Sequence, residues 1–257
     1  MKEENAQYLE KRLVYTGFGE ELIPELRVKM AEGKEKFELH FEKEISGKKV
    51  EANLKYSLST RGNYFFNSYD LKINRAEMEP LARSFNVSNQ ETYSLKEAFN
   101  LLEGRSVLKV NSKLENKEEG GKIEELKSWS YLDFTKTNSK GEPIMRKRYD
   151  YDLEAHVSKL PIKKLEIPAI KADLLQSLER GNLQSVMIEK DGEFKKHYLE
   201  AQPKYNSLTI YDENLVKQFV PHKKKEELSP DQKQKQSDKL VKGTPKQSKG
   251  KKSQGVQ

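Results

Sequence analysis

The stretch FNLLEGRSVLKV, residues 99–110, predicts the end of a helix, a glycine stop and the start of a strand. The same order of features occurs in RVKMAEGKEKFEL at residues 27–39 and in LQSLERGNLQSVMI at residues 175–188. In all three stretches an apolar residue lies three positions before the glycine, and another lies six positions after it. A phrase that recurs along a chain is typical of a protein built from similar units.

Gly33, Gly104 and Gly181 are the glycines of these stretches, and we predict that each one ends a helix. The residue after a helix often adopts a left-handed backbone conformation, in which a Cβ atom is strained. Their predicted role is therefore structural. Apolar residues at steps of four, as on one face of a helix, precede the first and third glycines: Leu22, Leu26 and Met30, and Ile170, Leu174 and Leu178.

Each predicted helix is followed by three stretches whose alternating apolar and polar residues indicate β-strands. Asp191-Gly192 separates two of these stretches and is a strong signal for a tight hairpin turn. The residues EEGGKIEE at 118–125 are predicted to form a flexible insertion between strands. The predicted strands lie at residues 36–42, 49–57 and 63–73, at 106–113, 129–136 and 144–153, and at 185–190, 194–201 and 207–215.

The predicted architecture is an α+β fold of up to three units packed side by side, each a helix followed by an antiparallel meander. A further short helix in residues 6–19 is expected to end near Gly17, and the spacing of Leu9 and Leu13 suits docking on the first unit. Triplication or duplication of one unit and independent arrival at the same pattern both remain open. The units are placed at residues 1–92, 93–164 and 165–220.

The net charge of the chain is concentrated in its last segment. The whole chain has a formal net charge of +7, from 48 Lys and Arg against 41 Asp and Glu. Residues 221–257 contain 11 lysines and 4 acidic residues, which accounts for the entire excess. The preceding residues are balanced, so charge alone does not identify the folded part as a nucleic-acid-binding domain.

Residues 221–257 are predicted to form a disordered tail, because they contain no aromatic residue and few aliphatic ones. One interpretation is a solubilising extension, and another is an arm that binds an acidic protein partner. A third is a polycationic arm that binds DNA or RNA phosphates without sequence preference by releasing counterions. The candidate nucleic-acid contacts are Lys223, Lys224, Lys225, Lys233, Lys235, Lys249, Lys251 and Lys252.

The segment MRKRYDY at residues 145–151 is a candidate binding surface within the predicted strands. Alternation places Arg146 and Arg148 on one face of the strand and Tyr149 on the other. Basic residues beside an aromatic one suit a single-stranded nucleic acid, whose bases stack on the ring. The acidic residues that follow favour the alternative of a solvated strand whose charges pair with one another.

The segment NYFFNSYDL at residues 63–71 is rich in aromatic residues. Alternation sends Phe65 to one face of the strand and Tyr64 with Phe66 to the other. One face is therefore predicted to be core, and the other can form an exposed aromatic platform.

Three phrases resemble uncharacterised proteins of conjugative and mobilisable elements in Bacteroidota: YLEKRLVYTGFGEEL at residues 8–22, YFFNSYDLKI at 64–73 and AFNLLEGRSV at 98–107. The basic, Gln- and Lys-rich ending adds to this resemblance. The last predicted unit is similar to domains of unknown function that are repeated in longer proteins of that setting. The resemblance covers most of residues 6–220. It implies that the gene belongs to a mobile element, but it indicates neither a reaction nor catalytic residues.

Signs of enzyme chemistry are few in this sequence. It contains no cysteine, and its histidines are far apart: His40, His156, His197 and His222. Neither a phosphate-cradling glycine loop nor a nucleophile elbow occurs. We therefore expect no catalytic residue, no cofactor, no metal site and no small-molecule substrate. The absence of a long apolar run and of a secretory signal favours a cytoplasmic protein with no membrane contact.

The sequence thus predicts a non-enzymatic accessory protein of a mobile element that associates weakly with DNA or RNA through its basic tail. The alternative is a protein-interaction adaptor that binds a partner through its sheets, with the tail incidental.

Overall fold

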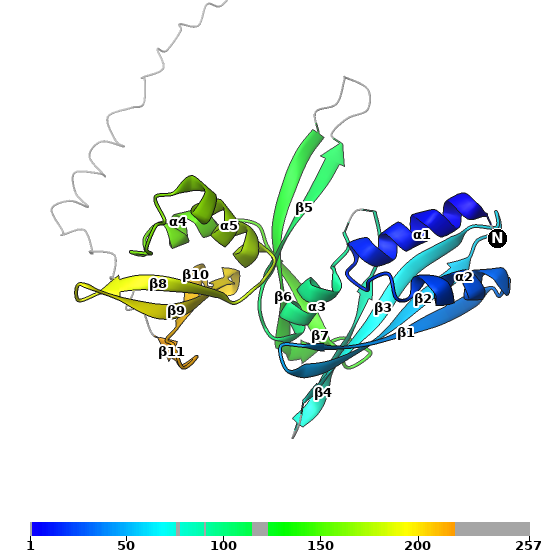
Figure 1. Ribbon diagram of the computed structural model, residues 1–257, viewed down its shortest axis with the longest axis horizontal. Coiled ribbons are helices and arrows are strands. Elements are labelled where there is room, and N and C mark those ends of the chain that lie inside the picture. The colour runs from blue at the N-terminus through cyan, green and yellow to red at the C-terminus, as the bar shows by residue number, and fades with distance from the viewer. Residues whose placement is uncertain (1, 76–77, 90, 115–122, 219–257) are drawn as a thin grey trace, which may run out of the picture. The chain divides into compact units, whose positions relative to one another are not determined.

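The computed structural model of the protein describes residues 2–75, 78–89, 91–114 and 123–218. In this part of the chain, helices combine with three antiparallel sheets, which confirms the α+β fold class (Figure 1). No helix in the described ranges has the length and apolar character needed to cross a membrane.

The helices are α1 (Glu3–Tyr15), α2 (Ile23–Ala31), α3 (Leu95–Leu102), α4 (Leu153–Val157) and α5 (Pro168–Glu179). The first sheet contains, in spatial order, β1 (Lys36–Ile45), β2 (Lys48–Leu58), β3 (Tyr64–Arg75) and β4 (Met78–Asn86). The middle sheet contains β5 (Val107–Leu114), β6 (Ile123–Thr137) and β7 (Pro143–Arg148). The third sheet has the spatial order β11-β10-β9-β8 and contains β8 (Gln184–Lys190), β9 (Glu193–Gln202), β10 (Ser207–Tyr211) and β11 (Lys217–Gln218).

The first hydrophobic core lies between helices α1 to α3 and one face of the first sheet (Figure 1). Leu9 and Leu13 of α1 are fully buried in it, which confirms the predicted docking of this helix. The ring of Phe18, just after α1, packs edge-on against that of Tyr69, with 5.0 Å between the ring centroids. The hydroxyl of Tyr69 donates to the carbonyl of Tyr93 at 2.7 Å, so the polar end of this buried side chain is satisfied.

The second hydrophobic core lies between α4, α5 and the inner face of the third sheet. Val157, Leu178 and Leu199 are fully buried there, and Trp129 joins them from β6 of the middle sheet. Helix α3 belongs to the first core and α4 to the second, so the predicted unit at 93–164 is divided between the two. The described residues therefore form two hydrophobic cores, not one core for each predicted unit.

Several strand predictions need correction. The first sheet has a fourth strand, β4, that shows no clear alternation because only Phe85 of this edge strand is buried and Pro80 interrupts it. The third sheet also has a fourth strand, the short β11. Strand β6 begins at Ile123, inside the insertion predicted at 118–125, while residues 115–122 lie outside the described part.

The strand predicted at 144–153 is also too long, because β7 ends at Arg148. The remainder of that stretch leads into α4, whose N-cap is Asp152. The side chain of Asp152 accepts a hydrogen bond from the backbone N–H of Ala155 at 2.9 Å. An N-cap carboxylate explains why this polar residue starts a helix and does not continue the strand.

Gly33, Gly104 and Gly181 follow the C-caps of α2, α3 and α5, with φ angles of +70°, +85° and +77°. The left-handed conformation expected of these glycines is thus observed. Gly181 is restricted further, because a Cβ atom there would lie 2.9 Å from the carbonyl oxygen of Ser106 and 3.0 Å from the side chain of Val107. The Asp191-Gly192 turn between β8 and β9 has positive φ at both positions, as predicted for a tight hairpin.

Helix α3 begins with a capping box. Ser94 Oγ accepts a hydrogen bond from the backbone N–H of Glu97 at 3.4 Å, and the Glu97 carboxylate accepts one from the Ser94 N–H at 2.8 Å. Lys109 of β5 binds the same carboxylate at 2.6 Å. The cap therefore connects the start of the helix to the middle sheet.

Replacing Ser94 by alanine is expected to lower the free energy of unfolding by about 1 kcal/mol, because the Glu97 N–H loses its side-chain acceptor. Ser94→Thr retains a hydroxyl and serves as the control, with stability close to that of the natural protein. Chemical denaturation measures both variants. Equal stability of the alanine and threonine variants would show that the cap contributes nothing.

Candidate nucleic-acid interface

The cations predicted to bind nucleic acid on β7 are already paired with acidic side chains. Arg146 Nε lies 3.7 Å from Asp133 Oδ2, and a terminal nitrogen of Arg148 donates to Asp150 at 2.9 Å. Lys147, between them, contacts the Glu91 carboxylate at 2.8 Å. These contacts agree with the alternative interpretation of MRKRYDY as a solvated strand whose charges pair with one another.

Tyr149 lies just beyond the end of β7 and is well exposed. Because β7 ends at Arg148, the strand alternation predicted from the sequence does not extend to Tyr149. Tyr149 lines a cleft that has one cation, Lys127, and four acidic residues: Asp150, Asp152, Glu154 and Glu179. Clustered carboxylates repel phosphate groups, so the surroundings of Tyr149 are unfavourable for a nucleic acid.

The tail lysines at 223–225, 233, 235, 249, 251 and 252 lie outside the described residues. The predicted disorder of residues 221–257 also concerns residues outside the described part of the chain. What the sequence establishes about this segment is its charge.

The aromatic segment at 63–71 divides between two faces as predicted. Tyr64 and Phe66 are buried in the first core, and Tyr69 is buried with them. Phe65 points to the other face of the first sheet and is half-exposed. This segment therefore supplies a single exposed ring.

A second set of exposed rings lies on the third sheet. Along β9, Leu199 and Ala201 point into the second core, so Phe194, Lys196 and Tyr198 point to the opposite, outer face. The ammonium group of Lys196 lies 5.1 Å from the ring centroid of Tyr198. Lysine and aromatic side chains are thus interleaved along one strand.

A loop segment adds a further lysine to this outer face. Ile162 forms a bridge with Ile188 of β8, and the next residue, Lys163, donates its backbone N–H to the carbonyl of Met187 at 2.9 Å. This pairing brings Lys163 to the outer side, where its ammonium group lies 5.2 Å from the ring centroid of Phe194. We name the set formed by Lys163, Met187, Phe194, Lys196 and Tyr198 the lysine–aromatic face.

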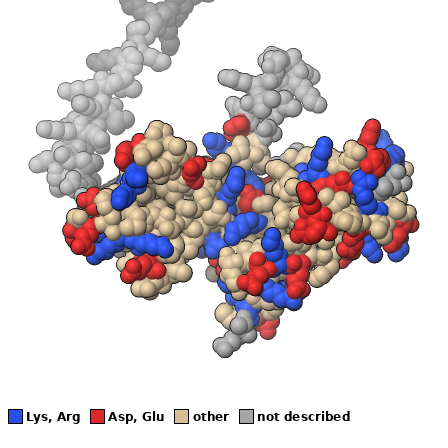
Figure 2. Space-filling view, viewed as in Figure 1, with Lys and Arg blue, Asp and Glu red and all other residues tan. Residues whose placement is uncertain are grey.

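Acidic side chains keep the lysine–aromatic face from being strongly positive. Glu189 stands opposite Phe194 in the strand register, and Glu200 accepts a hydrogen bond from the Tyr211 hydroxyl at 2.8 Å. Figure 2 likewise shows positive and negative side chains interspersed over the visible surface. The face therefore offers rings for stacking, whereas the excess of positive charge belongs to the sequence of the tail.

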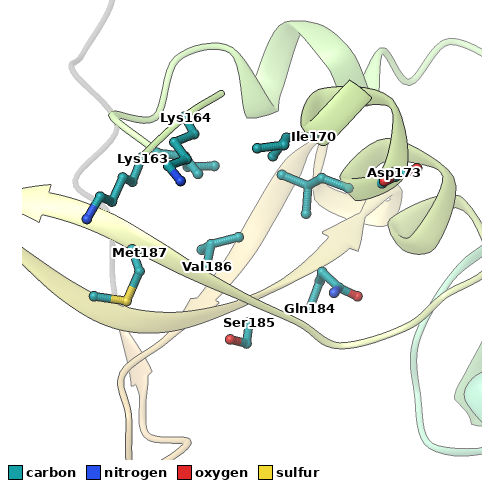
Figure 3. A pocket seen from close by; sticks show the side chains of 10 residues that line it. Lys163, Lys164, Ile170, Asp173, Gln184, Ser185, Val186 and Met187 are labelled. Carbon is teal, nitrogen blue, oxygen red and sulfur yellow. The ribbon is translucent and has the colours of Figure 1, made fainter. Parts of the chain in front are cut away.

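An apolar groove of about 450 Å³ lies between β8 and α5, and Lys163 and Met187 of the lysine–aromatic face also line it (Figure 3). Its apolar lining includes Ile162, Ile170, Leu174 and Val186, and Lys164 is among its polar residues. In Figure 3 the side chain of Val186 lies on the groove side of the strand, as its burial against the second core requires. The groove can accept an apolar side chain of a bound segment.

The free edge of β8 is covered only in part. Residues 161–163 pair with it, through Lys163 N–H to the carbonyl of Met187 and Glu189 N–H to the carbonyl of Pro161, both at 2.9 Å. Because backbone groups alternate along a strand, the N–H and carbonyl of Ser185 face the same edge, next to the covered part. An extended peptide could add there as a further strand.

The histidines in the described ranges serve local hydrogen bonds. His40 Nδ1 is 2.9 Å from Asn53 Oδ1, and His197 Nδ1 is 3.0 Å from the carbonyl oxygen of Lys195. His156 Nε2 is 3.3 Å from the side-chain oxygen of Asn206. No group of three histidine, aspartate or glutamate residues in the described part of the chain is arranged to hold a metal ion.

The chain matches no protein-family model, no curated protein and no solved structure. The resemblance to proteins of mobile elements therefore stays a prediction from the sequence.

The lysine–aromatic face was not predicted, although part of its signal is present in the sequence. FKKHY at residues 194–198 places an aromatic residue at each end of a strand segment and a lysine between them on the same face. Lys163 is more than thirty residues earlier in the chain and reaches this face only because residues 161–163 pair with β8.

Proposed function

We propose that the protein is a non-enzymatic accessory protein that associates with nucleic acid and prefers single strands. In this proposal the tail provides most of the affinity through its charge, and the lysine–aromatic face contributes base stacking. The observation that carries the preference is the exposure of Phe194 with the ammonium group of Lys163 above its ring. The mobile-element setting that the sequence resemblance implies would suit such an activity, because transfer of an element passes through single-stranded intermediates.

The physical reason for the preference is the accessibility of bases. In a duplex the bases are stacked on one another, whereas a single strand can place them on protein rings, with about 1–3 kcal/mol gained for each stacked base. Lysines beside the rings approach the neighbouring phosphates. The face is nearly neutral, so stacking alone gives weak binding, and the tail is required for most of the affinity.

Replacing Phe194 by alanine is expected to weaken binding of a single-stranded oligonucleotide by about 5- to 150-fold, the loss that corresponds to one stacked base. Binding of a duplex of the same length should change little, because its bases are not available to the ring. Fluorescence anisotropy with labelled strands measures both affinities.

Phe134→Ala is the matched control, because Phe134 is 44% exposed and Phe194 is 42% exposed, but Phe134 lies on the middle sheet. We expect this variant to bind both strands as the natural protein does. Equal losses in the two variants, or an equal loss for single strand and duplex, would contradict stacking on the lysine–aromatic face.

A second candidate function, an adaptor that binds an extended peptide, is favoured by the uncovered edge of β8 and the apolar groove beside it. Ser185→Pro removes the backbone N–H that faces this edge, and proline is tolerated on edge strands. For an adaptor, this variant should lose its protein partner while Phe194→Ala retains it. If the first proposal is correct, Phe194→Ala should weaken oligonucleotide binding while Ser185→Pro retains it.

A further inference from the structure

A second cleft, separate from the lysine–aromatic face, gathers positive charge. It encloses about 620 Å³ between the β1–β2 turn, α3 and the connection from α5 to β8. Three cationic side chains line it together with a single acidic one: Lys48, Lys96, Arg105 and Glu103. This is a local excess, because the charges of residues 1–220 balance as a whole.

The one acidic side chain in the cleft is already engaged. Glu103 binds the ammonium group of Lys48 at 2.5 Å, so this pair is neutral as a whole. Within the described part of the chain, neither Lys96 nor Arg105 lies within 4.0 Å of a carboxylate oxygen. The remaining charge of the cleft is therefore that of two cations.

Lys96 and Arg105 both contact the ring of Phe99. The ammonium group of Lys96 lies 4.9 Å from the ring centroid, and the guanidinium carbon of Arg105 lies 5.8 Å from it. Burial and the neighbouring guanidinium of Arg105 lower the pKa of Lys96, as expected when like charges are brought together. An anion between them would remove this repulsion.

Arg105 is fixed in place by hydrogen bonds that do not neutralise it. Its Nε donates to the carbonyl of Gly181 at 2.9 Å, and a terminal nitrogen donates to Asn100 Oδ1 at 2.7 Å. Gln184 also lines the cleft, and its side-chain oxygen accepts from Ser177 at 2.6 Å. With this oxygen engaged, the NH₂ group is the part of the Gln184 side chain that can donate to a bound group.

We propose that this cleft binds an anionic group of the phosphate class, held by Lys96 and Arg105 with the amide of Gln184 as an additional donor. A phosphate monoester carries about two negative charges and a backbone phosphodiester carries one, and the acceptor oxygens of either can bind two cations and an N–H donor. The group can belong to a free phosphorylated molecule or to the backbone of a nucleic acid. The site is independent of the proposed stacking on the third sheet.

Thermal unfolding of the full chain in inorganic phosphate, compared with chloride at equal ionic strength, tests this proposal. At phosphate ten times above its Kd, the folding equilibrium constant should rise about tenfold, which corresponds to roughly 3–6 °C in Tm for a protein of this size. Ions that bind the tail lysines equally in the folded and the unfolded chain leave Tm unchanged.

Lys96→Gln is expected to abolish the phosphate-dependent rise in Tm. Lys43→Gln serves as its control, because Lys43 is an exposed lysine on β1 outside the cleft. The control should retain the full rise. An equal response of both variants, or no response of the natural protein to phosphate or pyrophosphate, would overturn the proposal.

Calorimetric competition then distinguishes the two sources of the anion. If a single-stranded oligonucleotide prevents phosphate binding in the natural protein, the cleft holds a backbone phosphate of the nucleic acid. If phosphate binds equally well with the oligonucleotide present, the cleft holds a free phosphorylated molecule. Phosphate binding that survives in a chain unable to bind oligonucleotides would uphold this site while contradicting the proposed function.

Discussion

Gly181→Ala is expected to lower the free energy of unfolding by about 2–5 kcal/mol. Part of this loss is backbone strain, since a φ of +77° costs a residue with a Cβ atom about 1–2 kcal/mol. The other part is steric, because the new Cβ would lie 2.9 Å from the carbonyl oxygen of Ser106 and 3.1 Å from the Cβ of Asn100. Overpacking of this kind typically costs about 1–3 kcal/mol.

Gly33→Ala separates the two contributions. Gly33 has a φ of +70°, but no atom lies within 4 Å of the position that a Cβ would occupy. This variant should therefore lose only the strain part, about 1–2 kcal/mol. Urea denaturation of both variants gives the comparison. Equal losses would show that Gly181 does not pack closely against Ser106, just before β5.

Raising the salt concentration fourfold is expected to weaken binding of duplex DNA by about 500-fold. The estimate assumes that about five tail lysines neutralise phosphates, each contributing about −0.9 to the slope of log affinity against log salt. The tail provides enough charge for this, with 11 lysines against 4 acidic residues in 221–257. Anisotropy titrations at several salt concentrations measure the slope.

The control for the salt prediction is the chain that ends at Gln218. Without the tail the remaining charges are balanced, so any binding that persists should depend only weakly on salt. A slope near −1 in the full chain would mean that the tail engages about one phosphate. The affinity would then have to come from a folded surface, with Arg146, Arg148 and Tyr149 the residues predicted first from the sequence.

The arrangement of helices and strands was largely predictable because it follows from local patterns. The stripes of Leu26 and Met30 and of Leu174 and Leu178 lie on the buried faces of α2 and α5. The hairpin at Asp191-Gly192 was predicted from its turn residues alone. In contrast, β4 is an edge strand with one buried side chain, and α4 is a five-residue helix, so neither shows a clear period.

The cores and the candidate site were less predictable because they depend on contacts between distant residues. Asn100 is fully buried, yet its amide donates to the carbonyl of Arg180 at 2.8 Å, a pairing that no local pattern indicates. Lys163 joins Phe194 only through pairing of a loop with β8. The acidic residues that follow the cations of β7 already indicated charge pairing, and Asp150 is indeed the partner of Arg148. In contrast, Asp133, the partner of Arg146, could not be assigned from spacing.

The central claim, association with nucleic acid, is tested most directly by titrating a labelled single-stranded oligonucleotide with the full chain at physiological salt. We predict saturable binding with a Kd between about 10⁻⁶ and 10⁻⁴ M, as is typical of non-specific binding, and tighter than for a duplex of equal length. In the chain ending at Gln218, most of this affinity should be lost. No binding by the full chain at low salt, where electrostatic attraction is strongest, would contradict the account.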